Sequence, residues 1–281
     1  MSGAEYLSNQ QAINPYYTQG SIDVDQAKLE HEALVSLFES IGVRVVRIAP
    51  PNDSQDGVYT ANWALVRGNK AVLARLPNAR KSEEPYAQKT LQDLGKDVVT
   101  IPHDYKFSGQ GDALACGNYL FCGQGYRSDE EAQKFAAEIL GYTRIQLQTV
   151  PKLDEDGVAS INQASGWPES YFYDLDMALS IIKVPSGDEK GLIAYCKDAF
   201  TPESQSIIES LENIEKIIVS QDEAVHSFAC NLVSTGEQVV MSVGAPKLRA
   251  DLEAHGLIVH TPEMTELAKG GGYIRCVTLS I

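Results

Sequence analysis

The chain has few histidines and cysteines, fewer cationic than anionic side chains, and no long apolar run. Its 281 residues include five histidines, five cysteines, and 23 Lys and Arg against 38 Asp and Glu, which gives a net charge of −15. Nucleic acids and anionic membranes attract surfaces rich in Lys and Arg, so this balance argues against both as partners. A cationic small substrate suits the negative field, although an acidic surface that only aids solubility explains the charge equally well.

The sequence also lacks signals for membrane insertion or export. No run reaches the roughly 18 apolar residues that a transmembrane helix needs. Residues 1–20 have neither a basic start nor an apolar core. We therefore expect no signal peptide and predict a cytoplasmic location.

The cysteines predict neither a disulfide framework nor a zinc site. They are odd in number and irregularly spaced, at positions 116, 122, 196, 230 and 276, whereas a disulfide framework favours an even set in a short chain. Cys116 and Cys122 have no nearby Cys or His pair that would complete a tetrahedral site. We expect no metal and no cofactor.

A supersecondary unit recurs along the chain. Apolar spacing predicts helices over residues 27–42, 85–95, 130–141, 201–211 and 247–256, with strands after them at 43–48, 97–101, 143–148, 216–220 and 257–260. Hairpins with glycine turns lie between these pairs. The unit of helix, strand, loop and hairpin recurs about five times, which is typical of a repeat or propeller-like architecture. We interpret residues 1–281 as one domain and residues 1–25, polar and without period, as a loop or lid.

The glycine run Gly270-Gly271-Gly272 precedes the last cysteine, Cys276, at the start of a strand expected over 272–281. Glycine reaches positive φ and lets the backbone approach a ligand closely, so the run is suited to hold a thiol beside a substrate. The alternative is that Cys276 is a small buried hydrophobe, as most free cysteines are.

The repeat predicts where side chains meet. The loop between strand and hairpin should return to the same end of the fold in each unit, which brings together residues 56–63, 107–113, 171–177, 223–231 and 269–276. These loops carry acidic and amide side chains around one thiol, namely Asp56, Asn62, Asp112, Asp174, Asp176, Glu223, Asn231 and Cys276. For Arg80 and Lys81, beside two glutamates, two interpretations are open, contacts with a substrate carboxylate and a solvated face, and we favour the solvated face.

Five segments in order along the chain resemble the guanidino-group modifying superfamily. They are residues 58–62 (VYTAN), 107–114 (FSGQGDAL), 123–127 (GQGYR), 173–179 (YDLDMAL) and 270–278 (GGGYIRCVT). The superfamily includes dimethylarginine dimethylaminohydrolase, arginine deiminase, succinylarginine dihydrolase and the amidinotransferases. The resemblance implies an α/β fold, a five-bladed pentein-type propeller built from repeated ββαβ units.

The resemblance also implies a C–N hydrolase that acts on linear amidines, with a small cationic guanidino substrate. Cys276 would attack the guanidinium carbon and form a thiouronium intermediate. Asp112 and Asp176 would hold the guanidinium nitrogens, and Arg127 would pair with the substrate α-carboxylate. Asn62 stands where some members carry an aspartate, and the form resembles succinylarginine dihydrolase. A guanidinium matches carboxylates two at a time, and its charge lowers the pKa of a nearby thiol.

Two positions depart from the family pattern. The expected catalytic histidine is Asp174, and the acidic residue that normally orients it is Ser108. Repulsion from neighbouring carboxylates would raise the pKa of Asp174, so that it can replace the histidine as the proton donor. His103 or His226 is a less favoured substitute.

Three functions stay open at this point. A hydrolase is favoured, a catalytically impaired binder of an arginine-like ligand is the alternative, and an amidinotransferase differs only in the nucleophile of the second step. The sequence does not fix the oligomeric state, and a homodimer stays open as an assembly.

Overall fold

The computed structural model describes residues 11–17, 22–49, 51 and 54–281. The predicted loop or lid over residues 1–25 therefore lies partly outside the described residues. Among those described, no helix combines the length and the apolar character needed to span a bilayer.

The described residues form four three-stranded sheets. In each sheet the first two strands are antiparallel and the third is parallel to the second. The strands are β1 (Ala64–Arg67), β2 (Lys70–Leu73) and β3 (Asp97–Thr100); β4 (Ala113–Cys116), β5 (Tyr119–Gln124) and β6 (Thr143–Gln148); β7 (Leu179–Lys183), β8 (Gly191–Cys196) and β9 (Ile214–Val219); and β10 (Val233–Ser234), β11 (Gln238–Val240) and β12 (Ile258–His260).

A helix connects the second and third strands of every sheet, because two parallel neighbours need a crossover connection. These helices are α3 (Glu83–Asp93), α5 (Glu130–Leu140), α6 (Pro202–Glu209) and α8 (Pro246–Ala254). Local sequence sets their ends. The Thr201 side chain accepts from the backbone N–H of Ser204 at the start of α6, and Gly141 ends α5 with a φ of 70°. The α/β class and the repeated ββαβ order are confirmed.

The fifth unit differs from the prediction. Its helix exists as α2 (Val24–Ser40), but residues 43–48 and 272–281 form no strand. The C-terminal segment turns instead, since Val277 N–H donates to the carbonyl of Tyr273 and Thr278 N–H to that of Arg275. The two predicted strands are wrong, and the five-bladed propeller stays a prediction, as does a single domain over the whole chain.

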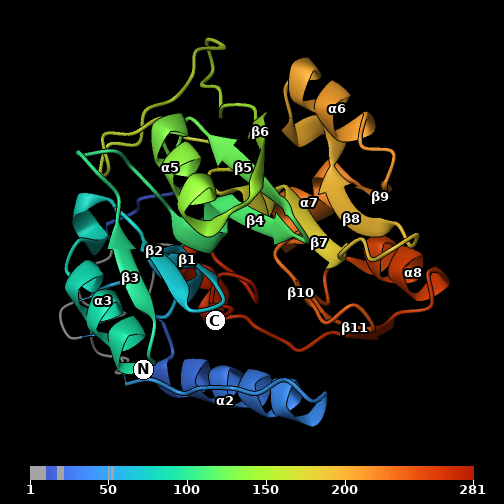
Figure 1. Cartoon of the computed structure of the whole chain (residues 1–281), viewed down its shortest axis with the longest axis horizontal. Coiled ribbons are helices and arrows are strands. Elements are labelled where there is room, and N and C mark those ends of the chain that lie inside the picture. Colours follow the sequence, from blue (N-terminus) through green and yellow to red (C-terminus); the bar gives the residue numbers. More distant parts are fainter. Residues whose placement is uncertain (1–10, 18–21, 50, 52–53) are drawn as a thin grey trace.

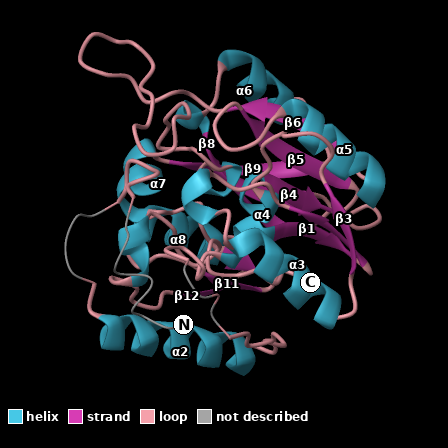
Figure 2. Cartoon of the chain, turned by 90° about the vertical axis from the view of Figure 1, so that its left-hand side faces the viewer, coloured by secondary structure: helices cyan, strands magenta, loops and turns pink. Residues whose placement is uncertain are grey.

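The four sheets surround the C-terminal segment, which is red in Figure 1. Helix α2 lies at one end of the molecule in both Figure 1 and Figure 2. Its buried Glu30 connects it to the segment that precedes the glycine run, because the carboxylate accepts from the backbone N–H groups of Thr265, Glu266 and Leu267. Helix α2 is thus bonded to the segment that leads into the glycine run.

Candidate active site

A short turn precedes the first strand of each sheet, and each turn carries one polar side chain of the cluster described below. The 3₁₀ turn η1 (Thr60–Trp63) carries Asn62, α4 (Gly109–Asp112) carries Asp112, and η3 (Leu175–Met177) carries Asp176. Asn231 lies two residues before β10. The convergence that the repeat predicts is confirmed for these turns by their contacts with one another and with Cys276, given below.

Asn231 fixes the position of the Cys276 thiol. Its amide oxygen accepts from the backbone N–H groups of Tyr273 and Cys276, both at 3.1 Å, and its amide nitrogen donates to Cys276 Sγ at 3.1 Å. Sγ also donates to Asp176 Oδ2 at 3.5 Å. No histidine among the described residues bonds to this thiol, so His103 and His226 have no support as proton carriers.

The glycine run is required by close packing on both sides. Gly271 has a φ of +89°, and a Cβ on it would lie 2.2 Å from Asn14 Oδ1. A Cβ on Gly272 would lie 2.7 Å from the Cβ of Cys276. Cβ atoms in proteins do not lie this close to other atoms. Only glycine at these positions therefore allows the C-terminal segment to pack against Asn14 and to place Cys276 in the cluster.

Asp112, Asp174 and Asp176 are all buried, and each has one carboxylate oxygen without a partner: Asp112 Oδ2, Asp174 Oδ1 and Asp176 Oδ1. The other oxygen of Asp112 accepts from the backbone N–H of Leu175 at 3.0 Å. Buried polar atoms in proteins are nearly always hydrogen-bonded. Three orphaned acceptors around one thiol therefore indicate a ligand that supplies several N–H donors. No group of three or more His, Cys, Asp or Glu side chains in the described ranges has the geometry of a metal site.

Asp174 bonds to polar side chains from two other turns. Its Oδ2 accepts from the Asn62 amide at 2.8 Å, and Ser108 also bonds to it. Ser108 and Asp174, which occupy the positions of the family's acid and histidine, thus still contact each other. Asn62 donates to both, which links the turn η1 to this pair.

Burial raises the pKa of every acidic group in the cluster. It raises that of Asp174, against the charge of Arg127 and the bonds from Ser108 and Asn62, which act to lower it. The pKa values of Asp112 and Asp176 rise well above 3.8, first through burial and then through the charge of Asp174. The raised pKa expected for Asp174 is found, but its main cause is burial.

The thiol of Cys276 is also held in its neutral form. Burial raises its pKa well above 9.0, and the charges of Asp176 and Asp174 raise it further. A cation bound among these carboxylates would reverse their effect on the thiol.

Arg127 lies at the edge of the cluster. It is buried, its Nη2 donates to the carbonyl of Ile13 at 2.9 Å, and its guanidinium lies 4.5 Å from the centre of the Tyr173 ring. Tyr173 in turn donates to the carbonyl of Gly271. The N-terminal segment therefore contacts both the glycine run and the cation predicted to bind a carboxylate.

Two members of the predicted ring have other partners. Glu223 accepts from the backbone N–H groups of Lys247 and Leu248, so it caps α8. Asp56 accepts from the Tyr17 hydroxyl at 2.5 Å. These bonds give both carboxylates a structural role, because the acceptors already have donors.

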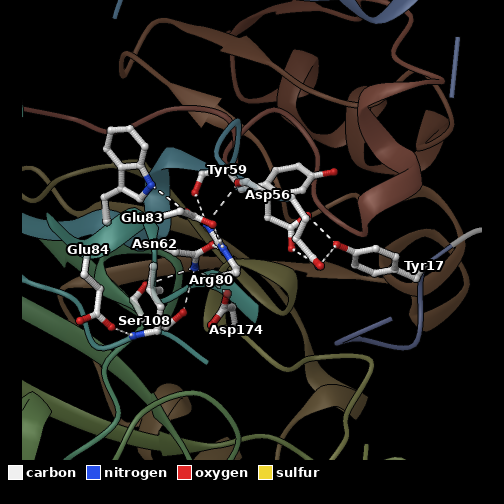
Figure 3. A network of polar contacts seen from close by, with 12 residues as sticks. Tyr17, Asp56, Tyr59, Asn62, Arg80, Glu83, Glu84, Ser108 and Asp174 are labelled. Atoms are coloured by element: carbon white, nitrogen blue, oxygen red, sulfur yellow. Dashed lines mark hydrogen bonds and ion pairs between the residues drawn. The ribbon is translucent and has the colours of Figure 1, made fainter. Parts of the chain in front are cut away.

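The favoured prediction that Arg80 lies on a solvated face is wrong. It is 2% exposed, and its guanidinium pairs with the equally buried Glu83 and donates to Asn62. Figure 3 shows this network. The spacing of three between Arg80 and Glu83 places both side chains on one side of a helical turn, so it could have indicated the ion pair, although not its burial.

A cavity of about 510 Å³ lies beside the cluster, between β4, β7 and β10. Its lining includes Asp176 and Arg275, but neither Cys276 nor Asp112 nor Asp174. The carboxylate cluster, and not this cavity, therefore holds most of the predicted site residues.

Known proteins resemble the chain over nearly its whole length. A family model described as N,N dimethylarginine dimethylhydrolase, eukaryotic, matches residues 7–160. An N(G),N(G)-dimethylarginine dimethylaminohydrolase of Mycobacterium tuberculosis is 31% identical over 272 residues, which cover 96% of this chain and 81% of that protein. The bifunctional arginine dihydrolase/ornithine cyclodeaminase ArgZ of Synechocystis sp. is 28% identical over 96% of this chain, but the chain spans only 35% of the ArgZ length.

Solved structures of the N-terminal domain of ArgZ, an arginine dihydrolase, resemble the whole fold. A cysteine-to-serine variant bound to its substrate gives a TM-score of 0.80 at 29% identity, over 96% of this chain and 92% of that one. Another variant, covalently bound to a reaction intermediate, gives a TM-score of 0.79 at 28% identity, over the same shares of the two chains. By its family match and its sequence identity, the chain belongs to the dimethylarginine dimethylaminohydrolase family of guanidino-group modifying proteins.

Proposed function

We propose that this protein is a cysteine-dependent hydrolase that acts on the guanidino group of arginine or an arginine derivative. The observation that carries the proposal is the set of three unpartnered, buried carboxylate oxygens around the Cys276 thiol. A guanidinium is planar and has N–H donors in a fixed fork, which matches carboxylates at its edges. Its positive charge also offsets the cost of burying these acids.

Each predicted site residue has a role in binding. Asp112 and Asp176 hold the guanidinium nitrogens through their free oxygens, and Asn62 fixes Asp174 beside them. Arg127 receives the α-carboxylate of the substrate at the edge of the cluster. The Ile13 carbonyl now bonded to Arg127 leaves part of its guanidinium available, since arginine has five N–H donors.

The first chemical step is attack by sulfur. The bound cation lowers the pKa of Cys276, and its proton passes to the Asp176 carboxylate, 3.5 Å away. The Sγ–C bond forms while the π electron pair of a C=N bond of the guanidinium moves to its nitrogen. The leaving nitrogen takes a proton from the carboxyl group, the C–N bond breaks, and an amine departs to leave a thiouronium cation.

The second step is hydrolysis. Water attacks the thiouronium carbon and gives a proton to the Asp174 carboxylate, whose bonds from Asn62 and Ser108 favour its ionised form. The C–S bond then breaks, the thiolate takes the proton back from the Asp174 carboxyl group, the former water oxygen loses its second proton to solvent, and a neutral ureido product leaves. The ArgZ domain that is covalently bound to a reaction intermediate supports a covalent route in this family.

We further infer a five-bladed propeller. Four blades correspond to the four sheets, and the C-terminal segment with residues 43–48 occupies the fifth position without strand pairing. The position of Cys276 relative to the four turns supports this arrangement.

Incubation with a panel of guanidino compounds tests the function. Purified protein is mixed with arginine, methylated arginines and agmatine, and products are followed by mass spectrometry. We expect turnover of at least one arginine derivative and its loss in Cys276→Ser, while Cys116→Ala, which removes a buried thiol in β4, retains it. Ligand binding without product would favour the impaired binder, and turnover that requires an added amine would favour an amidinotransferase.

A further inference from the structure

A cavity reaches the carboxylate cluster along the first strands of three sheets. This cavity, of about 510 Å³, is lined by residues of β4, β7 and β10 and by Asp176 and Arg275. Both β4 and β10 pack against β7 (Figure 1), and Ser234 Oγ in β10 donates to the carbonyl of Ile182 in β7 at 2.7 Å. The three strands that form the cavity wall are thus those whose preceding turns and loop carry Asp112, Asp176 and Asn231.

The cavity extends from the cluster to the protein surface. Its buried end includes Asp176 and Cys230, each 1% exposed. Its outer end includes Val184, which is 52% exposed, and the exposed hairpin residues Thr235 and Glu237 after β10. Asp176 precedes β7 and Val184 follows it. Because the five residues of β7 span about 16 Å, the cavity connects a buried carboxylate with the surface along the whole strand.

Asp176 contacts both the thiol and this cavity. Its Oδ2 accepts from Cys276 Sγ at 3.5 Å, and its Oδ1 has no hydrogen-bond partner. In the proposed reaction the Asp176 carboxyl group gives its proton to the leaving nitrogen, so the amine forms beside this residue. The amine is released while the rest of the substrate is still bonded to sulfur.

The N-terminal segment covers another side of the cluster. Asn14 Nδ2 donates to the carbonyl of Gly270 at 3.0 Å, and the carbonyl of Ile13 accepts from Arg127 Nη2 at 2.9 Å. The substrate α-carboxylate is proposed to bind on this side, at Arg127, so the covalently bound substrate occupies the space there. An amine that leaves before the ureido product therefore needs a different route.

We propose that the cavity along β7 is the exit for the amine of the first step, which leaves past Asp176 as a small neutral molecule, ammonia or a methylated amine. This inference rests on the proposed function. The amine carries away the electron pair of the broken C–N bond and the proton from Asp176, so it departs uncharged. The wall near Asp176 includes the buried Leu114, Leu179 and Leu232 together with Arg275. Apolar side chains and a cation both favour a neutral amine over an ammonium ion.

Two exposed wall residues allow the cavity to be narrowed without a change of charge. Val184 and Ala115 both line it and are both exposed. The pair Val184→Trp with Ala115→Trp places two indole rings at its outer end. The pair Ile218→Trp with Ile258→Trp is the matched control, because these residues are exposed in β9 and β12 and do not line the cavity. If the first pair does not fold, Val184→Trp alone takes its place.

The first readout follows access to the buried end and needs no activity. Cys230 lines the cavity and directly precedes Asn231, which bonds to the Cys276 thiol. In a Cys276→Ser background, modification of Cys230 by methyl methanethiosulfonate is followed by mass spectrometry of its peptide. Cys122, which is buried and does not line the cavity, reports general opening of the fold.

We expect modification of Cys230 to be at least about tenfold slower in the wall pair than in the control pair, since only local opening of the fold then admits the reagent. The rate at Cys122 should be the same in both. Equal rates at Cys230 in the folded wall pair and its control overturn the proposal.

The second readout is turnover. When the exit is closed, the amine stays beside the thiouronium carbon, attacks it and regenerates the substrate. We expect kcat of the wall pair to fall about tenfold or more because product release limits the rate. KM should not rise, because the substrate enters elsewhere. The loss should be larger for asymmetrically dimethylated arginine, which releases dimethylamine, than for arginine, which releases ammonia. The control pair should keep kcat within about twofold.

The two readouts together separate this inference from the proposed function. Slow modification of Cys230 with an unchanged kcat would mean that the amine leaves elsewhere, and it would overturn the proposal. Absence of turnover in the unchanged protein would contradict the proposed function and, with it, the role of the cavity as an exit. The labelling of Cys230 would then still decide whether the cavity leads to the cluster.

Discussion

At the scale of single residues, the position of the thiol depends on one buried asparagine. Asn231 is 0% exposed and uses its amide oxygen for two backbone N–H groups of the C-terminal turn, which leaves its nitrogen for Cys276 Sγ. This donor acts to lower the pKa of Cys276, against burial and the charges of Asp176 and Asp174. The asparagine therefore orients the sulfur and favours its thiolate.

Replacement of Asn231 by aspartate should separate these two roles. Asn231→Asp keeps an acceptor for the backbone N–H groups, but it removes the donor to Sγ and adds a negative charge. We expect kcat at neutral pH to fall about tenfold to a hundredfold, which corresponds to one charged hydrogen bond, with a smaller effect at high pH. Steady-state kinetics across the pH range measures this.

The control is the same substitution at an exposed position, Asn213→Asp in the turn before β9. It changes the net charge equally and should leave kcat within about twofold. A similar loss in both variants would assign the effect to overall charge and contradict the role given to Asn231.

Sequence motifs predicted the residues of the cluster but not all of their partners. Asp112, Asp174, Asp176 and Cys276 come together as expected, because short motifs before the strands place them. The burial of Arg80 was not predictable, because its ion pair with Glu83 is buried only when Trp63 and the turn η1 pack over it. The local sequence contains both residues of the ion pair, but it does not show the packing that buries them.

At the scale of secondary-structure elements, α2 stabilises the approach to the glycine run. The Glu30 carboxylate accepts three backbone N–H groups and the Thr265 hydroxyl at the segment that leads into η5 (Leu267–Gly270). Burial alone would raise the pKa of Glu30, but the hydrogen bonds from Leu267, Thr265 and Glu266 outweigh it, and the pKa falls below 4.5. Helix α2 therefore holds this segment most strongly when Glu30 is ionised.

Substitution of Glu30 by glutamine should weaken the fold in a pH-dependent way. Glutamine has the same shape but no charge, so we expect the free energy of unfolding at pH 7 to fall by about 1–2 kcal/mol. A lowered pKa contributes stability above the unfolded pKa, and this stability is lost as the pH falls through the folded pKa. Urea unfolding should show the difference at neutral pH and its progressive loss as the pH falls below 4.5 and through the lowered folded pKa of Glu30.

The exposed Glu39→Gln in α2 serves as the control, because it removes a charge from the same helix. A pH-independent loss in Glu30→Gln, or an equal loss in Glu39→Gln, would contradict the capping role of Glu30.

Elements with strong apolar period were predictable, and those fixed by tertiary contacts were not. The four crossover helices and their sheets lie within a few residues of the expected ranges. Residues 43–48 form no strand, and the C-terminal segment, also expected as a strand, turns where Asn231 accepts the backbone N–H groups of Tyr273 and Cys276. Helix α7 (Gln221–Ser227) was missed because its seven residues are too short to show a period, although Ser220 caps it.

At the scale of the whole molecule, repetition produces the site. Four units of the same order each place a turn at the same end, and the C-terminal segment brings the thiol to the turns that carry Asn62, Asp112, Asp176 and Asn231. The period was visible in the sequence. The hydrogen bond from Asn14 to the Gly270 carbonyl was not predictable, because these two residues are 256 positions apart in the sequence.

The measurement that tests the account most directly is the identity of a covalent adduct. The protein and Asp174→Asn, which should slow the second step, are mixed with arginine or with a dimethylated arginine, quenched in acid and digested. We predict that the peptide with Cys276 gains the mass of arginine less that of ammonia from arginine, and the same adduct from the asymmetrically dimethylated substrate. Turnover by Cys276→Ser at the rate of the unchanged protein, or an adduct on another cysteine, would contradict the account.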